Sequence, residues 1–429
     1  MINVTVYVVK PNDSIYSIAK ANGVSADTII STNKISNPTQ LVVGQSLVLP
    51  SSSHTYTVKN GDTIYSLARA NGVSQNAIFS ANPSIPSNGR LMPGQVITVP
   101  GAEAKLGTIE VNGYIFPKSN EQVVTANISS LTYLSIFSYQ VKADGSFEPI
   151  DDDKWISIAK SNHVAPIMVI TNIRSGGQFS SDTAHAILSN ESIQQVLINN
   201  VINNMKQKGY YGLNVDFEYL YPSDKQAYND FLKKLTDKLH SLGYVVFTAV
   251  APKTSAQQQG LLYEAHDYPF HGQTVDRVIL MTYEWGYLAG PPQAVAPLND
   301  VRKVVDYAVS VIPPSKILMG IPNYGYDWVL PYMPGTLAKT FSNTDAVNLA
   351  YQNNASISYD DTAQSPYYNY YDAQNRQHIV WFEDARSIKQ KLLLVNEYKL
   401  AGISYWTFER AFPQNYLILN SMFDIKKVI

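Results

Sequence analysis

Residues 212–218, Gly-Leu-Asn-Val-Asp-Phe-Glu, constrain the fold of this chain most, because apolar and polar residues alternate strictly along them. Successive side chains of a β-strand point to opposite faces, so this period of two predicts a strand. One face carries the apolar residues Leu213, Val215 and Phe217, and the other carries the polar residues Asn214, Asp216 and Glu218. Burying ionisable groups is costly unless they are paired or used, and a purely structural strand would carry valine or isoleucine there. The stretch therefore predicts a catalytic strand.

Seven other apolar runs of strand length occur after residue 105, and helical patterns such as 192–208 and 224–242 fall between strands. These other predicted strands are Val111–Phe116, Tyr133–Ser138, Ala165–Thr171, Val245–Val250, Arg277–Thr282, Ile317–Ile321 and Ala401–Thr407. Eight strands that alternate with helices predict an α/β fold, a (β/α)8 TIM barrel, whose active site lies at the carboxyl ends of the strands.

The barrel region, 105–429, exceeds the length of about 250 residues that is typical of this fold. The surplus lies between the last two strands, at about 328–384, and contains strand-like pieces and a tyrosine-rich stretch at 367–371. We expect a small α+β insertion there that forms one wall of a substrate cleft. The tyrosine-rich stretch reads as a loop whose rings pack within the insertion, with sugar stacking as the alternative.

The first hundred residues contain a repeat, with units at 1–50 and 54–100 that each read strand, turn, helix, helix, strand. Asp13 and Asp62 precede a Ser or Thr and an apolar helical run, which suits helix N-caps. Gly23 and Gly72 stand where helix C-caps are expected. Each unit has few groups capable of chemistry, so a binding module is the natural reading and a structural spacer the alternative.

Both units closely resemble LysM domains, in the opening strand, the Asp-Ser/Thr-Ile turn, the Ala-Asn-Gly-Val-Ser helix link and the closing Gly-Gln strand. The resemblance implies two small βααβ domains that bind polymers containing N-acetylglucosamine, which are peptidoglycan or chitin. Family sites lie between the first turn and the loop before the last strand. The positions that correspond are Asp13, Ser14 and Ile15, and Asp62, Thr63 and Ile64, with less weight on the segments around Val43 and Met92.

Glu218 is the outermost polar residue of the catalytic strand, and Asp216 lies one layer deeper. Two coupled carboxyl groups titrate as a pair, so one of them is held protonated near neutrality, and Glu218 is then a plausible general acid. Two groups on one strand cannot flank a sugar ring as the two carboxylates of ordinary glycosidases do. A glycosidase built this way needs another nucleophile, and the 2-acetamido oxygen of the substrate can serve.

Four motifs in order resemble glycoside hydrolase family 18: residues 211–218, Met281–Glu284, Gly320–Gly325 and Trp406. By that resemblance Glu218 is the general acid/base, and Asp216 orients the acetamido group and stabilises the oxazolinium. Tyr283 donates a hydrogen bond to the acetamido oxygen, and Trp406 forms the floor under the bound sugar. Substrate contacts are also expected from Asn214, Glu284, Trp285 and Asn323.

Three residues depart from the family pattern. Tyr211 and Asn214 replace the first two aspartates of the strand motif, and Glu284 replaces an aspartate. We expect a weaker charge relay beneath Asp216 and an altered pH profile. From sequence alone, Glu284 can also be a structural partner of Asp216, and Trp285 can be cleft wall or simple packing.

Two LysM units before such a barrel resemble the spore cortex-lytic N-acetylglucosaminidases. This resemblance implies hydrolysis of N-acetylglucosaminyl bonds in cortical peptidoglycan that carries muramic-δ-lactam, during germination. The alternatives are a chitinase and a non-catalytic glycan-binding protein of the same fold. The first ten residues lack the features of a signal peptide, which the spore assignment would explain, because such proteins are assembled from the mother cell without export.

The amino-acid composition limits the kinds of molecule that this chain is expected to bind. Lys plus Arg (32) nearly balances Asp plus Glu (34), so nothing indicates nucleic acid or an anionic membrane. The absence of cysteine excludes disulfides and thiolate metal sites. His266 and His271 flank Asp267 without a tight metal spacing and read as solvated loop residues, and 151–153 reads as a solvated turn. We expect no metal, no cofactor and a monomer.

Overall fold

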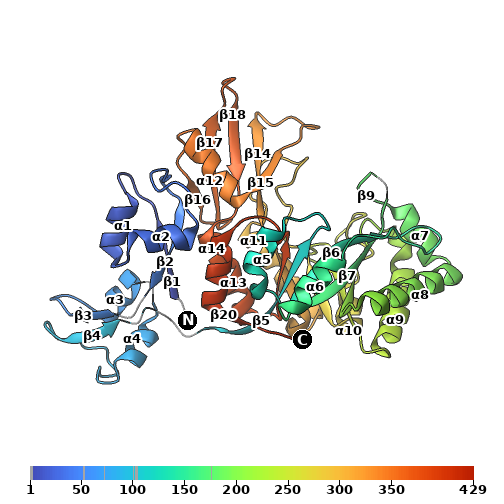
Figure 1. Ribbon diagram of the computed structural model, residues 1–429, viewed down its shortest axis with the longest axis horizontal. Coiled ribbons are helices and arrows are strands. Elements are labelled where there is room, and N and C mark those ends of the chain that lie inside the picture. The colour runs from blue at the N-terminus through green and yellow to red at the C-terminus, as the bar shows by residue number, and fades with distance from the viewer. Residues whose placement is uncertain (1–2, 52–53, 72, 100, 102–104, 175) are drawn as a thin grey trace.

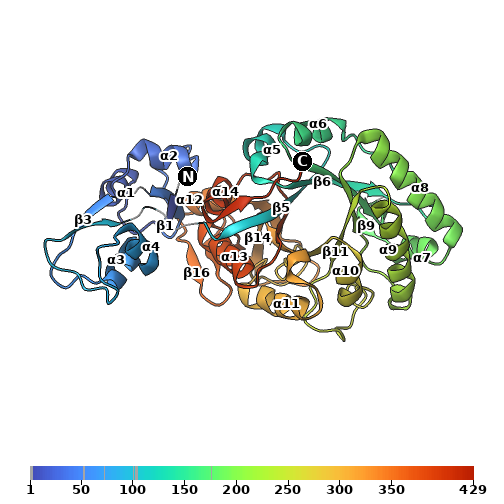
Figure 2. The same cartoon turned by 90° about the horizontal axis from the view of Figure 1, so that it is seen from below.

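The computed structural model describes residues 3–51, 54–71, 73–99, 101, 105–174 and 176–429. Its central feature is a barrel of parallel strands surrounded by helices (Figures 1 and 2). The strands are β5 (Gly107–Ile115), β6 (Tyr133–Gln140), β7 (Ala165–Thr171), β10 (Gly212–Asp216), β11 (Val245–Val250), β12 (Arg277–Leu280), β13 (Ile317–Pro322) and β19 (Gly402–Trp406). They pair in this order, and β19 pairs with β5, which closes the barrel. The predicted TIM barrel is confirmed.

Helices and short elements connect the strands. The α-helices are α5 (Glu121–Asn127), α6 (Asp153–Ser161), α7 (Ser181–Leu188), α8 (Glu191–Lys208), α9 (Lys225–His240), α10 (Tyr268–Thr274), α11 (Leu298–Val311), α13 (Ala385–Glu397) and α14 (Pro413–Met422). Three 3₁₀ turns lie at Ile128–Ser130, Pro222–Asp224 and Pro314–Lys316. Strands β8 (Ile173–Arg174) and β9 (Gln178–Phe179) form an antiparallel pair. Strand β20 (Phe423–Ile425) pairs with β5.

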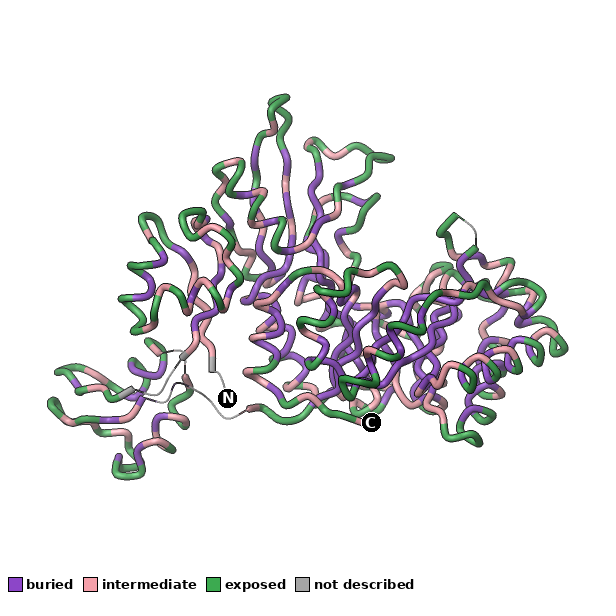
Figure 3. The backbone as a smooth tube through the Cα atoms, in the orientation of Figure 1, coloured by how far each residue is buried: buried purple, intermediate pink, exposed green. Residues whose placement is uncertain are grey.

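Strand β10 shows the predicted alternation. Leu213, Val215 and Phe217 are fully buried in the hydrophobic layer between the strands and the outer helices. Asn214 and Asp216 are buried on the opposite, inner side of the barrel. Figure 3 shows the strands as the most continuously buried part of the chain. The strand ends at Asp216, two residues earlier than predicted.

The amino ends of the strands are closed by an ion pair. The Arg277 guanidinium on β12 donates to both carboxylate oxygens of Glu110 on β5, at 2.5 and 2.6 Å, and Lys426 adds a bond of 2.9 Å. Burial alone would raise the pKa of Glu110, but these cations hold it below its usual value. The open end of the barrel is therefore the carboxyl end.

An antiparallel sheet is inserted between β13 and β19, as the sequence predicts. Its elements are β14 (Tyr324–Leu330), β15 (Lys339–Ser342), α12 (Asn343–Gln352), β16 (Ser358–Asp360), β17 (Ser365–Tyr371) and β18 (Gln377–Trp381), in the order β15-β14-β18-β17-β16. The tyrosine-rich stretch is strand β17, so its prediction as a loop is wrong. Its tyrosines alternate: Tyr368 and Tyr370 are buried in the insertion and Tyr371 is exposed. Period-two aromatic residues fit a half-buried strand.

The N-terminal repeats form two LysM domains of the predicted topology. The first contains β1 (Asn3–Val8), α1 (Ile15–Asn22), α2 (Ala26–Asn33) and β2 (Ser46–Ser51), and the second contains β3 (His54–Thr57), α3 (Ile64–Asn71), α4 (Gln75–Ala81) and β4 (Val96–Val99). In each domain the two strands pair in antiparallel fashion around a small apolar core.

The predicted N-cap of helix α1 is wrong by one residue. The cap is Ser14, which exchanges hydrogen bonds with Ser17, and Thr63 and Ser66 make the same exchange in the second domain. Asp13 instead accepts from the backbone N–H of Lys10 and from the Tyr7 hydroxyl, so its carboxylate ties the turn.

The C-cap predictions fare differently. Gly23 ends α1 with φ of 65°, as predicted, because glycine adopts this left-handed conformation without a Cβ clash. Gly72 lies outside the described residues.

The prediction that 151–153 is a solvated turn is wrong at its centre. Asp152 is fully buried and accepts hydrogen bonds from Tyr139, Tyr210 and Lys208, which satisfy its charge. Across the described part of the chain, no helix combines the length and apolarity needed to cross a bilayer.

Candidate active site

A cleft of about 620 Å³ opens at the carboxyl ends of the barrel strands. Eight of its lining residues are aromatic: Tyr114, Phe137, Phe179, Tyr219, Tyr263, Tyr283, Tyr287 and Trp406. Flat rings that stand around a polar centre suit the faces of sugar rings. The cleft therefore has the lining expected of a carbohydrate site.

Asp216 reaches this cleft from the last position of β10. The close fit of β10 between its neighbours fixes this position, since a Cβ on Gly212 would lie 2.5 Å from the Val245 side chain. Only 4% of Asp216 is exposed, and its Oδ1 has no hydrogen-bond partner among the described residues. Burial raises its pKa to about 7. Near neutrality this carboxyl group can exist in either protonation state.

Glu218 follows β10, and its backbone is held by Asn172, which directly follows β7. The Glu218 N–H donates to Asn172 Oδ1 at 3.0 Å, and Asn172 Nδ2 donates to the Glu218 carbonyl at 2.8 Å. These two bonds take the place of strand pairing, which explains why β10 ends before Glu218. Sequence reasoning missed Asn172, because a single amide at a strand end carries no pattern of its own.

The electrostatics of the cleft favour a protonated Glu218. Burial raises its pKa well above the usual value, and the charges of Asp216 and Glu284 raise it further. A carboxylic acid that keeps its proton at neutral pH can donate it to a leaving group. The geometry can therefore supply a general acid next to an ionisable partner.

Asn214 lies deeper in the barrel than Asp216 and is fully buried. Its Nδ2 donates to the hydroxyl of Tyr114, which lines the cleft. Its Oδ1 has no partner among the described residues. Its contact with the cleft is thus made through Tyr114.

Tyr283 stands beside both carboxyl groups. Burial raises the pKa of its hydroxyl well above the usual value, and the neighbouring Tyr114, Asp216 and Glu218 raise it further. The hydroxyl therefore keeps its proton at neutral pH and can act as a hydrogen-bond donor. Gly320 makes room for its ring, because a Cβ there would lie 2.8 Å from Tyr283 Cε1.

Glu284 is the third carboxyl group that lines the cleft. Its Oε1 accepts hydrogen bonds from the hydroxyls of Tyr324 and Tyr326, both on β14 of the insertion. Burial raises its pKa. The alternative that Glu284 pairs with Asp216 is not what the structure has: the partners of Glu284 are tyrosines.

Trp406 ends β19 and packs edge-on against three aromatic rings, of which Tyr114 and Phe137 also line the cleft. Its ring centroid lies 4.9 Å from Phe137, 5.3 Å from Tyr114 and 5.8 Å from Phe116. This packing fixes the indole, which lines the cleft together with Asp216. Its role as the floor under a bound sugar stays a prediction.

Three of the predicted substrate-binding residues lie outside the cleft lining: Asn214, which reaches it only through Tyr114, and Asn323 and Trp285. Asn323 is fully buried, and its amide binds Thr407, Tyr416 and Asn415. Trp285 packs against the outer hydrophobic layer. The structure thus brings together Asp216, Glu218, Tyr283, Glu284 and Trp406, with Asn214 behind them.

The histidines of the segment after β11 are buried, so their prediction as solvated loop residues is wrong. His266 accepts from the Ala251 N–H and donates from Nε2 to the Phe217 carbonyl, both at 2.9 Å. Burial lowers the pKa of His266 and His271, which keeps both neutral. His266 thereby fixes the backbone next to Glu218. No cluster of three or more His, Cys, Asp or Glu residues in the described ranges could hold a metal ion.

The predicted LysM residues divide by exposure. Ser14 and Thr63 are exposed at the start of α1 and α3, and Asp13 and Asp62 are half-buried beside them. The side chains of Ile15 and Ile64 are buried in the domain cores, at 4% and 3% exposed. In each domain, the groove expected from the LysM family lies between the first turn and the loop before the last strand. A ligand there could meet the backbone of these isoleucines but not their side chains.

Two neighbouring carboxyl groups of raised pKa, set in an aromatic cleft at the mouth of a TIM barrel, are the features of a glycoside hydrolase. The comparison with known families agrees. The model of the glycosyl hydrolases family 18 matches residues 110–411, and that of the LysM domain matches 7–50 and 56–100. The chain belongs to glycosyl hydrolase family 18 and carries two LysM domains.

Known proteins are similar to this chain, either along its whole length or over part of it. The cortical fragment-lytic enzyme of Bacillus subtilis (strain 168) is 46% identical over 98% of this chain and 99% of its own length. The crystal structure of the Bacillus megaterium QM B1551 spore cortex-lytic enzyme SleL matches with a TM-score of 0.88, at 43% identity and full coverage of both chains. A chitinase from Chromobacterium violaceum ATCC 12472 matches with a TM-score of 0.68, at 27% identity, over 73% of this chain and 98% of its own.

Proposed function

We propose that this glycoside hydrolase is an N-acetylglucosaminidase that cleaves N-acetylglucosaminyl bonds in spore cortex peptidoglycan containing muramic-δ-lactam, during germination. Its place is then the spore cortex region, bound to peptidoglycan. The division that goes with this proposal is 1–50 and 54–100 for glycan binding and 105–429 for catalysis. Similarity to cortical fragment-lytic enzymes along the whole chain, LysM domains included, supports it.

The observation that carries the proposal is the set of carboxyl groups in the cleft. Of the described lining residues, only Asp216, Glu218 and Glu284 carry one, and Glu284 is held by two tyrosine hydroxyls. Asp216 and Glu218 project from one strand end and cannot stand on opposite faces of a sugar. This arrangement supports a reaction in which the 2-acetamido oxygen of the substrate is the nucleophile.

The steps follow from the protonation states. Glu218 gives its proton to the glycosidic oxygen as the bond to C1 breaks, and the acetamido oxygen attacks C1 to form an oxazolinium. The Asp216 carboxylate stabilises the positive N–H, and Tyr283 donates to the acetamido oxygen. Water then attacks C1 as the C1–O bond of the oxazolinium breaks, which regenerates the acetamido group. The water passes a proton to Glu218, which restores the acid, and the two displacements together retain the anomeric configuration.

Replacing the acid tests this mechanism directly. We expect Glu218→Gln to lower kcat on soluble cortical fragments by about 10²- to 10⁴-fold, because glutamine cannot supply the proton. The measurement is reducing-end release, with the thermal midpoint as a control for folding. Unchanged turnover by Glu218→Gln would falsify the assignment of Glu218.

Substrate assistance makes a second prediction. A fragment whose N-acetyl groups have been removed lacks the nucleophile, so its turnover should fall at least as far as that of Glu218→Gln on the intact fragment. Equal turnover of acetylated and deacetylated fragments would contradict the mechanism and leave the fold assignment untouched.

A chitinase is the second candidate. The structural match to a chitinase, which covers 73% of this chain, supports it. Mass analysis of products from chitin oligomers and from cortical fragments, at equal enzyme concentration, separates the two. Preferred turnover of chitin would reject the cortex assignment. A non-catalytic glycan-binding role is tested by the same assay, since such a protein would release no products from either substrate.

A further inference from the structure

The two LysM domains differ in what covers the outer face of their strands. In the first domain the outward residues Val4, Val6 and Val48 pack into the hydrophobic layer of the barrel, where Val48 is fully buried. The matching residues of the second domain include Thr55, which is exposed, and Thr98, which is half-buried. Figures 1 and 2 show the first domain against α14 and the second farther from the barrel.

The loop before β2 of the first domain is bonded to the catalytic domain. The Val43 carbonyl accepts from the N–H of Ile357 in the insertion at 2.8 Å, and the Gly44 carbonyl accepts from Arg386 at 3.1 Å. Val42 is buried in the apolar core of the insertion. A Cβ on Gly44 would lie 1.8 Å from the Ile357 carbonyl oxygen, so the two backbones are in direct contact.

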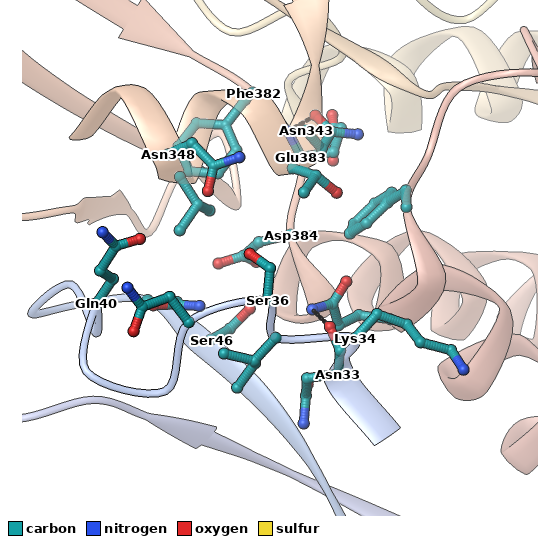
Figure 4. A pocket seen from close by; sticks show the side chains of 17 residues that line it. Asn33, Lys34, Ser36, Gln40, Ser46, Asn343, Asn348, Phe382, Glu383 and Asp384 are labelled. Carbon is teal, nitrogen blue, oxygen red and sulfur yellow. Dashed lines mark hydrogen bonds between the residues drawn. The ribbon is translucent and has the colours of Figure 1, made fainter. Parts of the chain in front are cut away.

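Figure 4 shows the same junction around a polar cavity of about 90 Å³. Asn33 and Ser46 of the first LysM domain face Asn343 and Asp384 of the catalytic domain across it. Ser46 Oγ accepts from the Ala385 N–H at 3.3 Å. The junction therefore combines buried apolar surface with paired backbone groups.

The corresponding loop of the second domain is open. Met92, which matches Val42, is 65% exposed, and Val96, which matches Ser46, is 64% exposed. A Cβ on Gly94 would meet nothing within 4 Å, although Gly94 and Gly44 share a φ of 84°. No hydrogen bond or ion pair joins described residues 54–71 and 73–99 to the catalytic domain in this structure.

We propose that the two LysM domains have different tasks. The first is a fixed part of the catalytic body, because its outward valines and the loop before β2 pack against that body. The insertion covers this loop, which is one wall of the glycan groove of the first domain. The second, with both walls of its groove open, is the surface that binds N-acetylglucosamine-containing glycan of the insoluble wall. This division of tasks rests on the proposed function, of which it specifies the wall-binding site.

Exposed tyrosines give the two domains a matched pair of probes. Tyr16 and Tyr65 occupy the second position of α1 and α3, next to the first turn, and are 72% and 61% exposed. An aromatic ring beside a groove can stack on a sugar face. If only the second groove receives glycan, then only Tyr65 contributes to binding.

The experiment measures retention of the full chain on insoluble cortical peptidoglycan, in a Glu218→Gln background so that the wall is not digested. We expect Tyr65→Ala and Met92→Glu each to weaken retention about tenfold, the scale of one lost aromatic or apolar contact. Tyr16→Ala, the control, should stay within twofold. Thermal midpoints of all variants report folding.

A loss with Tyr16→Ala as large as that with Tyr65→Ala would overturn the division of tasks, and so would full retention of Tyr65→Ala and Met92→Glu. Failure of the unsubstituted background protein to bind the wall would overturn it together with the LysM part of the proposed function. The catalytic part is read separately, from turnover of soluble fragments by the chain with Glu218 intact.

Discussion

The position of Asp216 lowers the folding stability of the protein when its carboxyl group is ionised, because the group is removed from water. It is almost fully buried, and its Oδ1 lacks a partner among the described residues. Desolvation therefore raises its pKa to about 7. This residue links the stability of the protein to pH in a direction opposite to that of an ion-paired aspartate.

The sign of this linkage follows from the two pKa values. The unfolded chain releases the Asp216 proton near pH 4, whereas the folded chain keeps it to about 7. Below pH 4 the Asp216 carboxyl group is protonated in both the folded and the unfolded chain, so its burial does not oppose folding through ionisation. As pH rises from 4 to 7 the unfolded state gains stability by ionising, so folding stability is lost.

Asp216→Asn removes this titration. We expect its Tm, relative to that of the unsubstituted protein, to rise by about 2–5 °C between pH 4 and pH 8. Differential scanning calorimetry across that range makes the measurement. Asp361→Asn, which removes an exposed carboxyl group between β16 and β17 that makes no ion pair among the described residues, is the control and should change much less with pH. An equally small change for Asp216→Asn would show that its carboxyl group is not desolvated.

Residue by residue, the sequence predicted those site members that belong to a pattern. Asp216 and Glu218 were predictable because a strictly alternating strand exposes the anomaly of buried acids. Asn172 and His266 were not, since each acts through one backbone atom brought near by the fold. Tertiary hydrogen bonds of this kind leave no periodic signal.

Among the elements, the duplicated sequences give duplicated structure, with two differences. Both LysM domains have the same helices, the same serine or threonine exchange at the first helix and the same glycine at φ of 84°. They differ in the outward strand residues and in the loop before the last strand. The matched glycines at 44 and 94 make this difference measurable.

We expect Gly94→Ala to destabilise its domain by about 1 kcal/mol, the usual cost of alanine in the left-handed region. Gly44→Ala carries the same cost and also forces its Cβ against the Ile357 carbonyl, so it should cost clearly more. Hydrogen exchange at the Ile357 amide should accelerate in Gly44→Ala only, because that amide donates to Val43. Equal effects of the two substitutions on stability and exchange would show that the junction is not closed in solution.

Element boundaries could be predicted less well than element types. Strand β10 ends early because Asn172 binds the Glu218 backbone, and the helix cap falls on Ser14 because Asp13 is engaged by the turn. Both outcomes depend on which of two competing hydrogen bonds forms. Local propensity does not decide that competition.

For the whole molecule, the barrel was predictable because eight alternations of strand and helix have few other compact arrangements. The inserted sheet was predictable from surplus length. The docking of the first LysM domain was not, since it pairs the outward valines and loop of residues 3–51 with surfaces more than 300 positions away. A sequence displays those valines, but not what covers them.

The valine face of the first LysM domain bears on how such enzymes can change by gain or loss of modules. A descendant that lost the second repeat would lose the proposed wall-binding site, but the apolar surface of its catalytic domain would stay covered by the first repeat. One that lost the first would leave bare apolar surface beside α14 and would need replacements there to remain soluble. The two repeats are therefore not interchangeable, because only the valine face of the first covers apolar surface of the catalytic domain.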